Sequence, residues 1–350
     1  MGGGGTRRIL KSQSTFLNHF RNVMMDSKGK PRKYLTLHDV DFVVNPSEKL
    51  IDQFMAGYGK ERLNFKRNDI DIWKQSFGLR FNNAFMVIRE SGHIMLTAHF
   101  IDYPAISPEL DTLHQYQGFL WIDPNFRGLD SMLLSDYFAK QRLRNVTDNA
   151  VAQCMPSSLK LWTKNYGQKG VGHTQFVSFY EPSEMRVPEE LKFDGITVRS
   201  ANEVPDGDIT KYDQSIFPYE RKKYMLTHLR DPAGIGKVAY DDQGNVVGLG
   251  TVIIYPSGEC VLTPLYADNQ KIAQAIFKSI LQEINLNDKK LLRFHIRSIN
   301  NDKEKFEWIQ PFVKNPIRRE LMGYLTYVTH LPIVNYKKVF VNVPYTTSAI

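Results

Sequence analysis

Apolar residues follow two spacings along the first half of the chain. Residues 35–44, 83–90 and 93–104 alternate or run together as expected for strands, and Ser91-Gly92 marks a tight hairpin turn. Residues 45–78 carry apolar positions three and four apart, which indicates two helices. With the later segments, the predicted order is β, α, α, β, β, β, α, β, α, β over about 150 residues.

A similar order returns in the second half. Residues 195–201 are predicted as a strand, followed by two helices separated at Pro218. A hairpin, a strand at 258–267, a long helix at 268–284 and further strands follow, and the run 335–344 closes the pattern. Residues 181–195 are rich in Pro and Glu and interrupt it. We therefore predict a leader at 1–33, a first domain at 34–183, a linker at 184–193 and a second domain at 194–350.

The stretch Gly118–Arg144 combines a strand, a turn and a helix. GFLWI is an apolar strand, DPNFRG a turn and LDSMLLSDYFAKQRLR a helical pattern. A strand that enters a helix through a short loop leaves backbone N–H groups unpaired, and these favour an anion such as phosphate. The same pattern also fits an ordinary corner without a ligand.

Composition narrows the function classes. The hydrophobic fraction is 42% and the net charge is +8. Residues 1–33 hold eight basic residues and one acid, a net +7, so the remaining chain carries only about +1. The basic charge therefore belongs to the leader, and no nucleic-acid partner is expected. Cys154 and Cys260 lie far apart without metal-ligand spacing, so we expect reduced thiols and no metal.

The N-terminus MGGGGT fits the pattern for N-myristoylation, with Gly2 as the acceptor and basic residues close behind. A single acyl chain and a polybasic segment together hold a protein at a membrane. The alternative is a flexible, solvated leader. No apolar run approaches the roughly 20 residues of a membrane span. We expect a cytoplasmic protein, associated with membranes if Gly2 is lipidated.

This element order resembles the GNAT superfamily of N-acetyltransferases, twice over. Asp123–Gly128 resembles the family's D/N-P-x-[YF]-R-G approach to its acyl-CoA loop, and Ser157–Gly167 its L-Y-x-K segment. The second half is similar to the C-terminal acetyltransferase-like domain of the YitH/HolE type, through residues 260–281 and 217–229. The resemblance implies an α/β protein with two GNAT-like domains, each a mixed, strongly twisted central sheet flanked by helices.

The resemblance further implies direct acyl transfer from acetyl-CoA to an amine, without a covalent intermediate. We take the N-terminal domain as the cofactor-binding candidate and the C-terminal domain as the substrate side. The cofactor-binding residues it implies are Ile122, Asp123, Asn125, Phe126, Arg127, Gly128 and Leu129 at the first corner, and Leu265, Tyr266, Ala267, Asn269 and Gln270 at the second.

Two departures from the family pattern support an alternative function. The first loop lacks the glycines that follow Gly128, and Trp162 stands where the family often has an acidic Tyr. Tyr166, one turn on, is the substitute acid, and Glu259 is the candidate base. Either could instead be an ordinary packing or surface residue. The alternative is a catalytically inactive GNAT-fold binding or adaptor protein. The sequence does not identify the acceptor amine.

Overall fold

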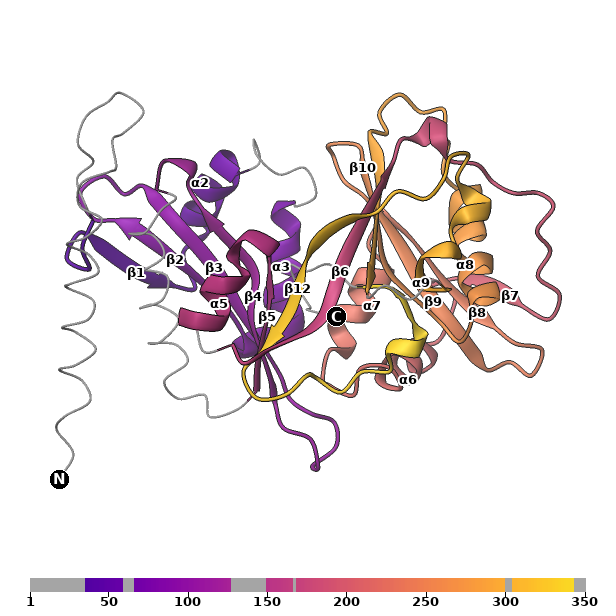
Figure 1. The fold of residues 1–350 in the computed structure, drawn as a ribbon, viewed down its shortest axis with the longest axis horizontal. Helices are drawn as coiled ribbons and strands as arrows, with labels where there is room; N and C mark the ends of the chain where they lie inside the picture. The colour runs from indigo at the N-terminus through magenta and orange to yellow at the C-terminus, as the bar shows by residue number, and fades with distance from the viewer. Residues whose placement is uncertain (1–34, 59–65, 127–148, 166–167, 300–303, 343–350) are drawn as a thin grey trace.

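The computed structural model describes residues 35–58, 66–126, 149–165, 168–299 and 304–342 (Figure 1). We call residues 35–183 the N-terminal half and residues 194–342 the C-terminal half. The elements of the N-terminal half are β1 (Val40–Val44), α2 (Glu48–Tyr58), α3 (Arg67–Phe77), η1 (Gly78–Arg80), β2 (Phe81–Ile88), β3 (Ile94–Tyr103), β4 (Leu113–Ile122), η2 (Pro124–Phe126), β5 (Asn149–Cys154), η3 (Pro156–Ser158), α5 (Leu159–Asn165) and β6 (Gly170–Tyr180).

The C-terminal half begins with the same order as the N-terminal half: a strand, two α-helices and three further strands. Its elements are β7 (Thr197–Ser200), α6 (Asp206–Gln214), α7 (Lys222–Leu229), β8 (Gly234–Tyr240), β9 (Val246–Ile254), β10 (Glu259–Ala267), α8 (Gln270–Gln282), β11 (Arg293–Ile299), α9 (Glu304–Glu307), η5 (Gln310–Phe312), β12 (Glu320–Tyr327), η6 (Tyr336–Lys338) and β13 (Val339–Val341). The mixed α/β architecture predicted from the sequence is confirmed.

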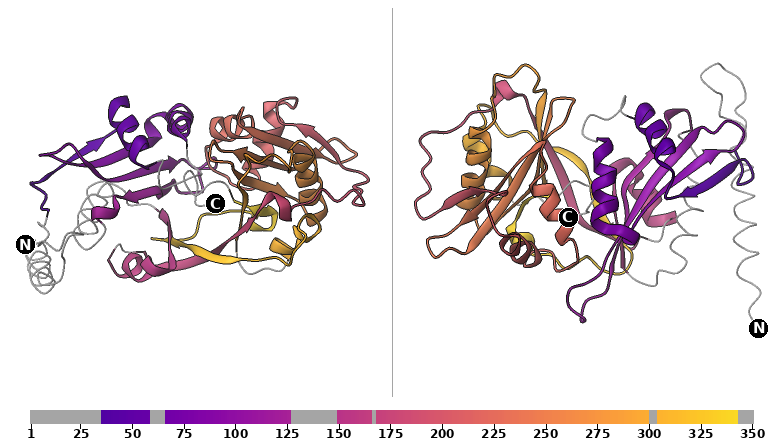
Figure 2. Two further views of the ribbon diagram at one scale, coloured as in Figure 1. Left: turned by 90° about the horizontal axis from the view of Figure 1, so that it is seen from above. Right: turned by 180° about the vertical axis from the view of Figure 1, so that it is seen from behind.

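One sheet runs through both halves. Its order is β1-β2-β3-β4-β5-β12-β6-β11-β10-β9-β8-β7, and β13 pairs with β10 beside this path. Figures 1 and 2 show β6 and β12 as the long strands that join the two groups. The two halves therefore exchange strands. β12 of the C-terminal half pairs with β5, and β6 of the N-terminal half pairs with β11. The predicted boundary at 184–193 stays a prediction, but the halves on either side of it share strands.

Alternating side chains cover the two faces of the sheet. In β2, Phe85 and Val87 belong to a core with α2 and α3, whereas Ala84 and Met86 face the core that holds Trp162 of α5. This period of two is what a sheet buried on both faces requires. In the C-terminal half, α6 and α7 cover the same face as α2 and α3, and α8 covers the opposite face.

The two halves also pack through aromatic rings. α3 lies against α7, and the rings of Phe77 and Tyr224 stack with centroids 5.4 Å apart. Tyr103 of β3 meets Phe217 edge-on at 5.5 Å. One core of buried residues therefore extends across both halves, which makes independent unfolding of either half unfavourable.

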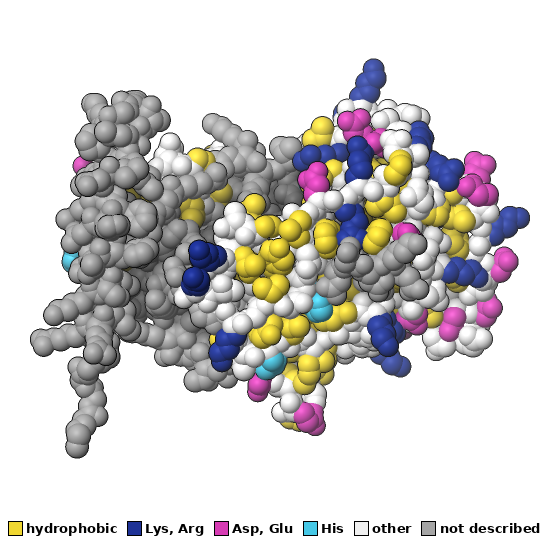
Figure 3. Space-filling view, viewed as in Figure 1, with side chains coloured by type: hydrophobic (Ala, Val, Ile, Leu, Met, Phe, Trp, Pro, Cys, Tyr) yellow, Lys and Arg dark blue, Asp and Glu magenta, His cyan; other side chains and the backbone are white. Residues whose placement is uncertain are grey.

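Where helices do not cover the central strands, the surface is apolar. Figure 3 shows hydrophobic side chains gathered over the middle of one face, where β6 and β12 lie side by side. Val171 on β6 and Leu321 on β12 are each more than 40% exposed. None of the helices in the described ranges combines the length and hydropathy that crossing a membrane requires.

We predict that Leu325→Ala in β12 destabilises the whole chain. Leu325 is 1% exposed in the shared core, so its truncation should lower the free energy of unfolding by about 2–5 kcal/mol. Urea denaturation should still show one transition. The control is Ile333→Ala, whose side chain is 52% exposed. Two separate transitions, or an equal loss in the control, would contradict the shared core.

Candidate functional site

The site in the N-terminal half is the place where two parallel strands part. β4 and β5 pair only where Leu113–Gln115 of β4 lie beside Asn149–Val151 of β5. β4 continues along β3 to Ile122, whereas β5 continues along β12 to Cys154. Within the described residues, no strand pairs with the β5 side of β4 beyond Gln115. The two strands therefore diverge beyond Gln115, an arrangement in which an extended ligand can lie between neighbouring strands.

A β-bulge lies beside the point where β4 and β5 diverge, which we call the opening of the N-terminal half. The register of β3 and β4 shifts between Ala98 and Phe100, so that residues 117–119 of β4 face His99 alone. A bulge re-aims backbone groups and bends the strand, and bulges are frequent next to active sites. The strand itself begins at Leu113, earlier than the strand predicted to start at Gly118.

Asp123 builds the corner that follows β4. One oxygen of its buried carboxylate accepts the Asn125 N–H at 2.8 Å, and the other lies 2.9 Å from Nε2 of His93. The Phe126 N–H donates to the Asp123 carbonyl, and the Phe126 ring lies 5.4 Å from the His93 ring. Asp123, Asn125 and Phe126 thus form one corner directly after Ile122, and their predicted role in cofactor binding stays a prediction.

Several predicted residues lie outside the described residues. These are Arg127, Gly128 and Leu129 of the first loop, the candidate acid Tyr166, and the candidate lipidation site Gly2. Their roles stay predictions. Trp162, in contrast, is described: it is 3% exposed in the core beneath β2 and β3.

The C-terminal half contains the same arrangement, but its opening is filled. β10 and β11 pair in parallel from Glu259–Leu262 to Arg293–Ile296, and β10 has a bulge between Leu262 and Leu265. Beyond it, β13 pairs antiparallel with Leu265 and Tyr266. These two predicted cofactor residues are fully buried.

The Tyr266 side chain belongs to a buried ionic network. Its hydroxyl accepts a hydrogen bond from Nη2 of Arg221 at 3.2 Å, and Arg221 forms a two-point ion pair with Asp213 at 2.7 and 3.0 Å. Burial alone would lower the pKa of Arg221, but the charge of Asp213 outweighs it and raises the pKa. Burial raises the pKa of the Tyr266 phenol, so the network holds a charged guanidinium and a neutral phenol.

The residues between β10 and α8, which form the second corner, are also engaged in contacts within the protein. The Asn269 side chain caps α8 by accepting the Ile272 N–H at 3.1 Å, so the helix begins slightly later than the predicted start at residue 268. Asp268 instead accepts hydrogen bonds from Tyr212 and Lys338, at 2.8 and 2.7 Å. Ala267 is fully buried.

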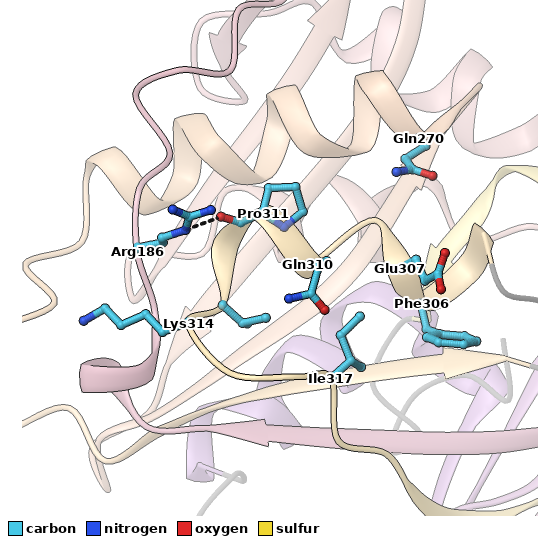
Figure 4. A pocket seen from close by; sticks show the side chains of 9 residues that line it. Arg186, Gln270, Phe306, Glu307, Gln310, Pro311, Lys314 and Ile317 are labelled. Atoms are coloured by element: carbon cyan, nitrogen blue, oxygen red, sulfur yellow. Dashed lines mark hydrogen bonds between the residues drawn. The ribbon is translucent and has the colours of Figure 1, made fainter.

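Gln270, the last predicted residue of this corner, lines a groove of about 1030 Å³ below α8. Figure 4 shows Gln270 at one end of this groove and Arg186 toward the other. Arg186 donates from Nε to the Pro311 carbonyl at 2.7 Å, and Lys314 donates to the Ser183 carbonyl at 2.7 Å. Both side chains thus donate to backbone carbonyls of their own chain. The groove therefore does not present them as ligands for a phosphate group.

Glu259 lies at the opposite end of β10 from Tyr266. Its fully buried carboxylate pairs with Arg293 at 2.9 Å and with His295. Burial alone would raise the pKa of Glu259, but the hydrogen bonds and charges of these partners outweigh it and lower the pKa. A carboxylate held in this way accepts a proton poorly, so the geometry gives little support to Glu259 as a base.

Sequence reasoning missed the groups that close the second opening. His228 of α7 contacts the Thr263 carbonyl of the bulge through Nε2, at 2.7 Å. The Thr263 hydroxyl donates to the Asn342 carbonyl at 3.0 Å. The run 335–344 was predicted as a strand, but nothing in its pattern indicates its partner. Among the described residues, no group of three or more His, Cys, Asp or Glu could hold a metal ion.

Two family models match this sequence. Residues 37–216 match a family described as a protein of unknown function (DUF1248), and residues 209–310 match an acetyltransferase (GNAT) domain. No match was found among curated protein sequences.

Solved structures share the fold across nearly the whole chain. A proposed acetyltransferase from Pyrococcus horikoshii is 13% identical with a TM-score of 0.60, covering 91% of this chain and 99% of its own. A tandem GNAT protein of the clavulanic acid pathway is 9% identical with a TM-score of 0.60, covering 83% and 99%. Saccharomyces cerevisiae N-myristoyltransferase, with bound myristoyl-CoA, is 10% identical with a TM-score of 0.56, covering 92% and 88%. At these identities the likeness shows the fold, and the tandem GNAT architecture predicted from the sequence is confirmed.

We predict that stability falls in acid partly because of His228. Burial lowers the pKa of His228 to about 4, below its ordinary value of 6.5. Between those values the unfolded chain binds a proton that the folded chain does not. The free energy of unfolding therefore carries no penalty from His228 above pH 6.5. It falls toward pH 4, by at most about 1.4 kcal/mol per pH unit. Urea unfolding of His228→Gln, which can still donate to Thr263, should show a shallower acid slope. An unchanged slope would contradict this account.

Proposed function

We propose an acyl-transfer function for this chain, which belongs to the DUF1248 family of proteins of unknown function and has the GNAT acetyltransferase fold. In this proposal the N-terminal half binds acyl-CoA, with acetyl-CoA as the expected co-substrate. The acyl group passes to an amine, whose identity neither the sequence nor the fold specifies.

The observation that carries the proposal is the parting of β4 from β5. The arm of coenzyme A is an extended chain with amide groups, and amides can pair with an exposed strand edge as another strand would. β4 and β5 diverge beyond Gln115, next to the bulge at residues 117–119, and we place this arm between the diverging strands. The bulge supports a role in polarising the thioester carbonyl, because re-aimed N–H groups can bind a developing oxyanion.

The corner after β4 supports phosphate binding. Asp123 ties the start of the loop to His93 on one side and to the Asn125 backbone on the other. The Asp123 carboxylate is thereby engaged within the protein and its charge is partly compensated. Arg127, Gly128 and Leu129 follow directly in the sequence, and we assign them to the diphosphate of coenzyme A as part of this proposal.

The chemistry needs no covalent enzyme intermediate. A neutral amine attacks the thioester carbonyl, the carbon–sulfur bond breaks, and the thiolate of coenzyme A leaves. The amine nitrogen loses a proton, and the thiolate gains one. Tyr166 is proposed as the acid that protonates the thiolate; for the base, the pairing of Glu259 with Arg293 and His295 favours another group or solvent.

A second candidate function is a catalytically inactive GNAT-fold binding protein. The position where the family often has a Tyr is Trp162, which is 3% exposed in the core and has no acidic proton to give. An inactive protein would retain the fold, and cofactor binding without turnover would identify it.

Localisation belongs to the proposal as well. The leader pattern supports a cytoplasmic protein with Gly2 lipidated and held at a membrane by the basic residues that follow. Mass spectrometry of the N-terminal peptide from a eukaryotic host decides this point: an unmodified Gly2 would exclude it.

We predict that Asp123→Ala weakens acetyl-CoA binding. The substitution removes both side-chain ties of the first corner, so the backbone N–H groups lose their fixed orientation. The Kd measured by calorimetry should rise roughly tenfold, equivalent to about 1.4 kcal/mol. Acyl transfer, followed as release of the coenzyme A thiol with a panel of amines, should fall with it.

The matched control is Asp268→Ala at the corresponding corner of the C-terminal half. It removes comparable ties, to Tyr212 and Lys338, so it should lower stability but leave the Kd unchanged. An intact protein that binds no acetyl-CoA, or an equal loss of affinity in both variants, would refute the proposal.

A further inference from the structure

The last strand of the chain occupies the opening of the C-terminal half. β10 and β11 part after Leu262 and Ile296. β13 then pairs with β10, with Val341 opposite Leu265 and Val339 opposite Tyr266. β13 also lies against β11, so it sits between the parted strands. The backbone edge that β10 would offer to an extended ligand is therefore already paired.

Burial shows how completely the opening is filled. Val339, Phe340, Val341 and Asn342 are each 4% exposed or less. Val339 packs in the core shared by both halves, whereas Phe340 and Val341 pack in the core below α8. Burying these three apolar side chains stabilises the strand in this position. The strand is an integral part of two cores.

Polar contacts hold the segment at both ends. The Thr263 hydroxyl in the bulge donates to the Asn342 carbonyl at 3.0 Å. Before the strand, Lys338 pairs with Asp268 at 2.7 Å, and the Asn335 N–H donates to the Ile216 carbonyl at 2.9 Å. His228 contacts the Thr263 carbonyl of the bulge. The bulge and the corner, which a cofactor would use, are thus engaged by the protein itself.

The N-terminal half provides the comparison. β4 and β5 diverge in the same way, and β4 carries a bulge just beyond the point where their pairing ends. In the described part of the chain, no strand corresponding to β13 pairs with β4 there. Among the described residues, the two repeats therefore differ: β13 pairs with β10 in the second opening, and no described strand pairs with β4 in the first.

We propose that β13 stands in place of an acyl-CoA in the C-terminal half, so that the chain binds a single acyl-CoA, in the N-terminal half. The binding of one cofactor per chain rests on the proposed function. The filling of the C-terminal opening by β13 does not rest on it. The C-terminal half then contributes a rigid scaffold and the exchanged strand β12. Its buried Arg221, Asp213 and Tyr266 are structural groups below the filled slot.

The test locks β13 in place in the full-length protein. Leu265 and Val341 lie directly opposite each other on antiparallel strands, a separation that a disulfide can bridge. The double variant Leu265→Cys with Val341→Cys should form this disulfide in air, identified by peptide mass spectrometry. Leu265→Cys alone is the control. Acetyl-CoA is then titrated into the oxidised and the reduced double variant by calorimetry.

Our inference predicts that the disulfide forms and that both forms bind one acetyl-CoA per chain, with Kd values within about twofold of each other. Binding of two cofactors, or binding abolished by the disulfide and restored by reduction, would overturn it. So would a folded double variant whose two thiols do not pair. If the disulfide forms but neither form binds acetyl-CoA, the filled slot is supported and the proposed acyl-transfer function fails.

Discussion

The structure depends on one constraint: where two parallel strands part, the backbone groups between them need new partners. An unpaired N–H or C=O group that is shielded from water costs on the order of a lost hydrogen bond. The chain meets this constraint twice, once at β4 and β5 and once at β10 and β11. At the second place β13 pairs with β10, whereas at the first no strand among the described residues pairs with β4 beyond Gln115. That difference between two similar halves is the main reason for assigning a ligand to the first.

Strand exchange explains why the filled half would be retained. β12 enters the sheet between β5 and β6, and β6 in turn continues the sheet into β11. The N-terminal half thus takes a strand from beyond residue 319, and its opening lies one strand away from it. Aromatic contacts between α3 and α7 add a second connection on one face. Rigid surroundings favour a binding site, because a parted pair of strands keeps its shape only if its outer edges are held.

Local patterns in the sequence predicted most of the elements but not their partners. The hairpin turn at Gly92, with φ of 66°, and the amphipathic face of α8 follow from residue spacing alone. Asp123 at the first corner was also predictable, because an Asp before Pro readily starts a turn. The filling of the second opening was not, since the pairing of Val341 with Leu265 joins residues far apart in sequence and leaves no periodic signal. The paired state of Glu259 escaped prediction for the same reason: its partners Arg293 and His295 lie on a neighbouring strand.

The most direct measurement of the central claim is amide hydrogen exchange of the whole protein with and without acetyl-CoA. The account predicts that acetyl-CoA slows exchange in β4 beyond Gln115 and in the corner at residues 123–126. Exchange in β10 and β13 should be slow already and should not change. Protection that appears in β10 and β13 instead, or in neither half at saturating acetyl-CoA, would contradict it.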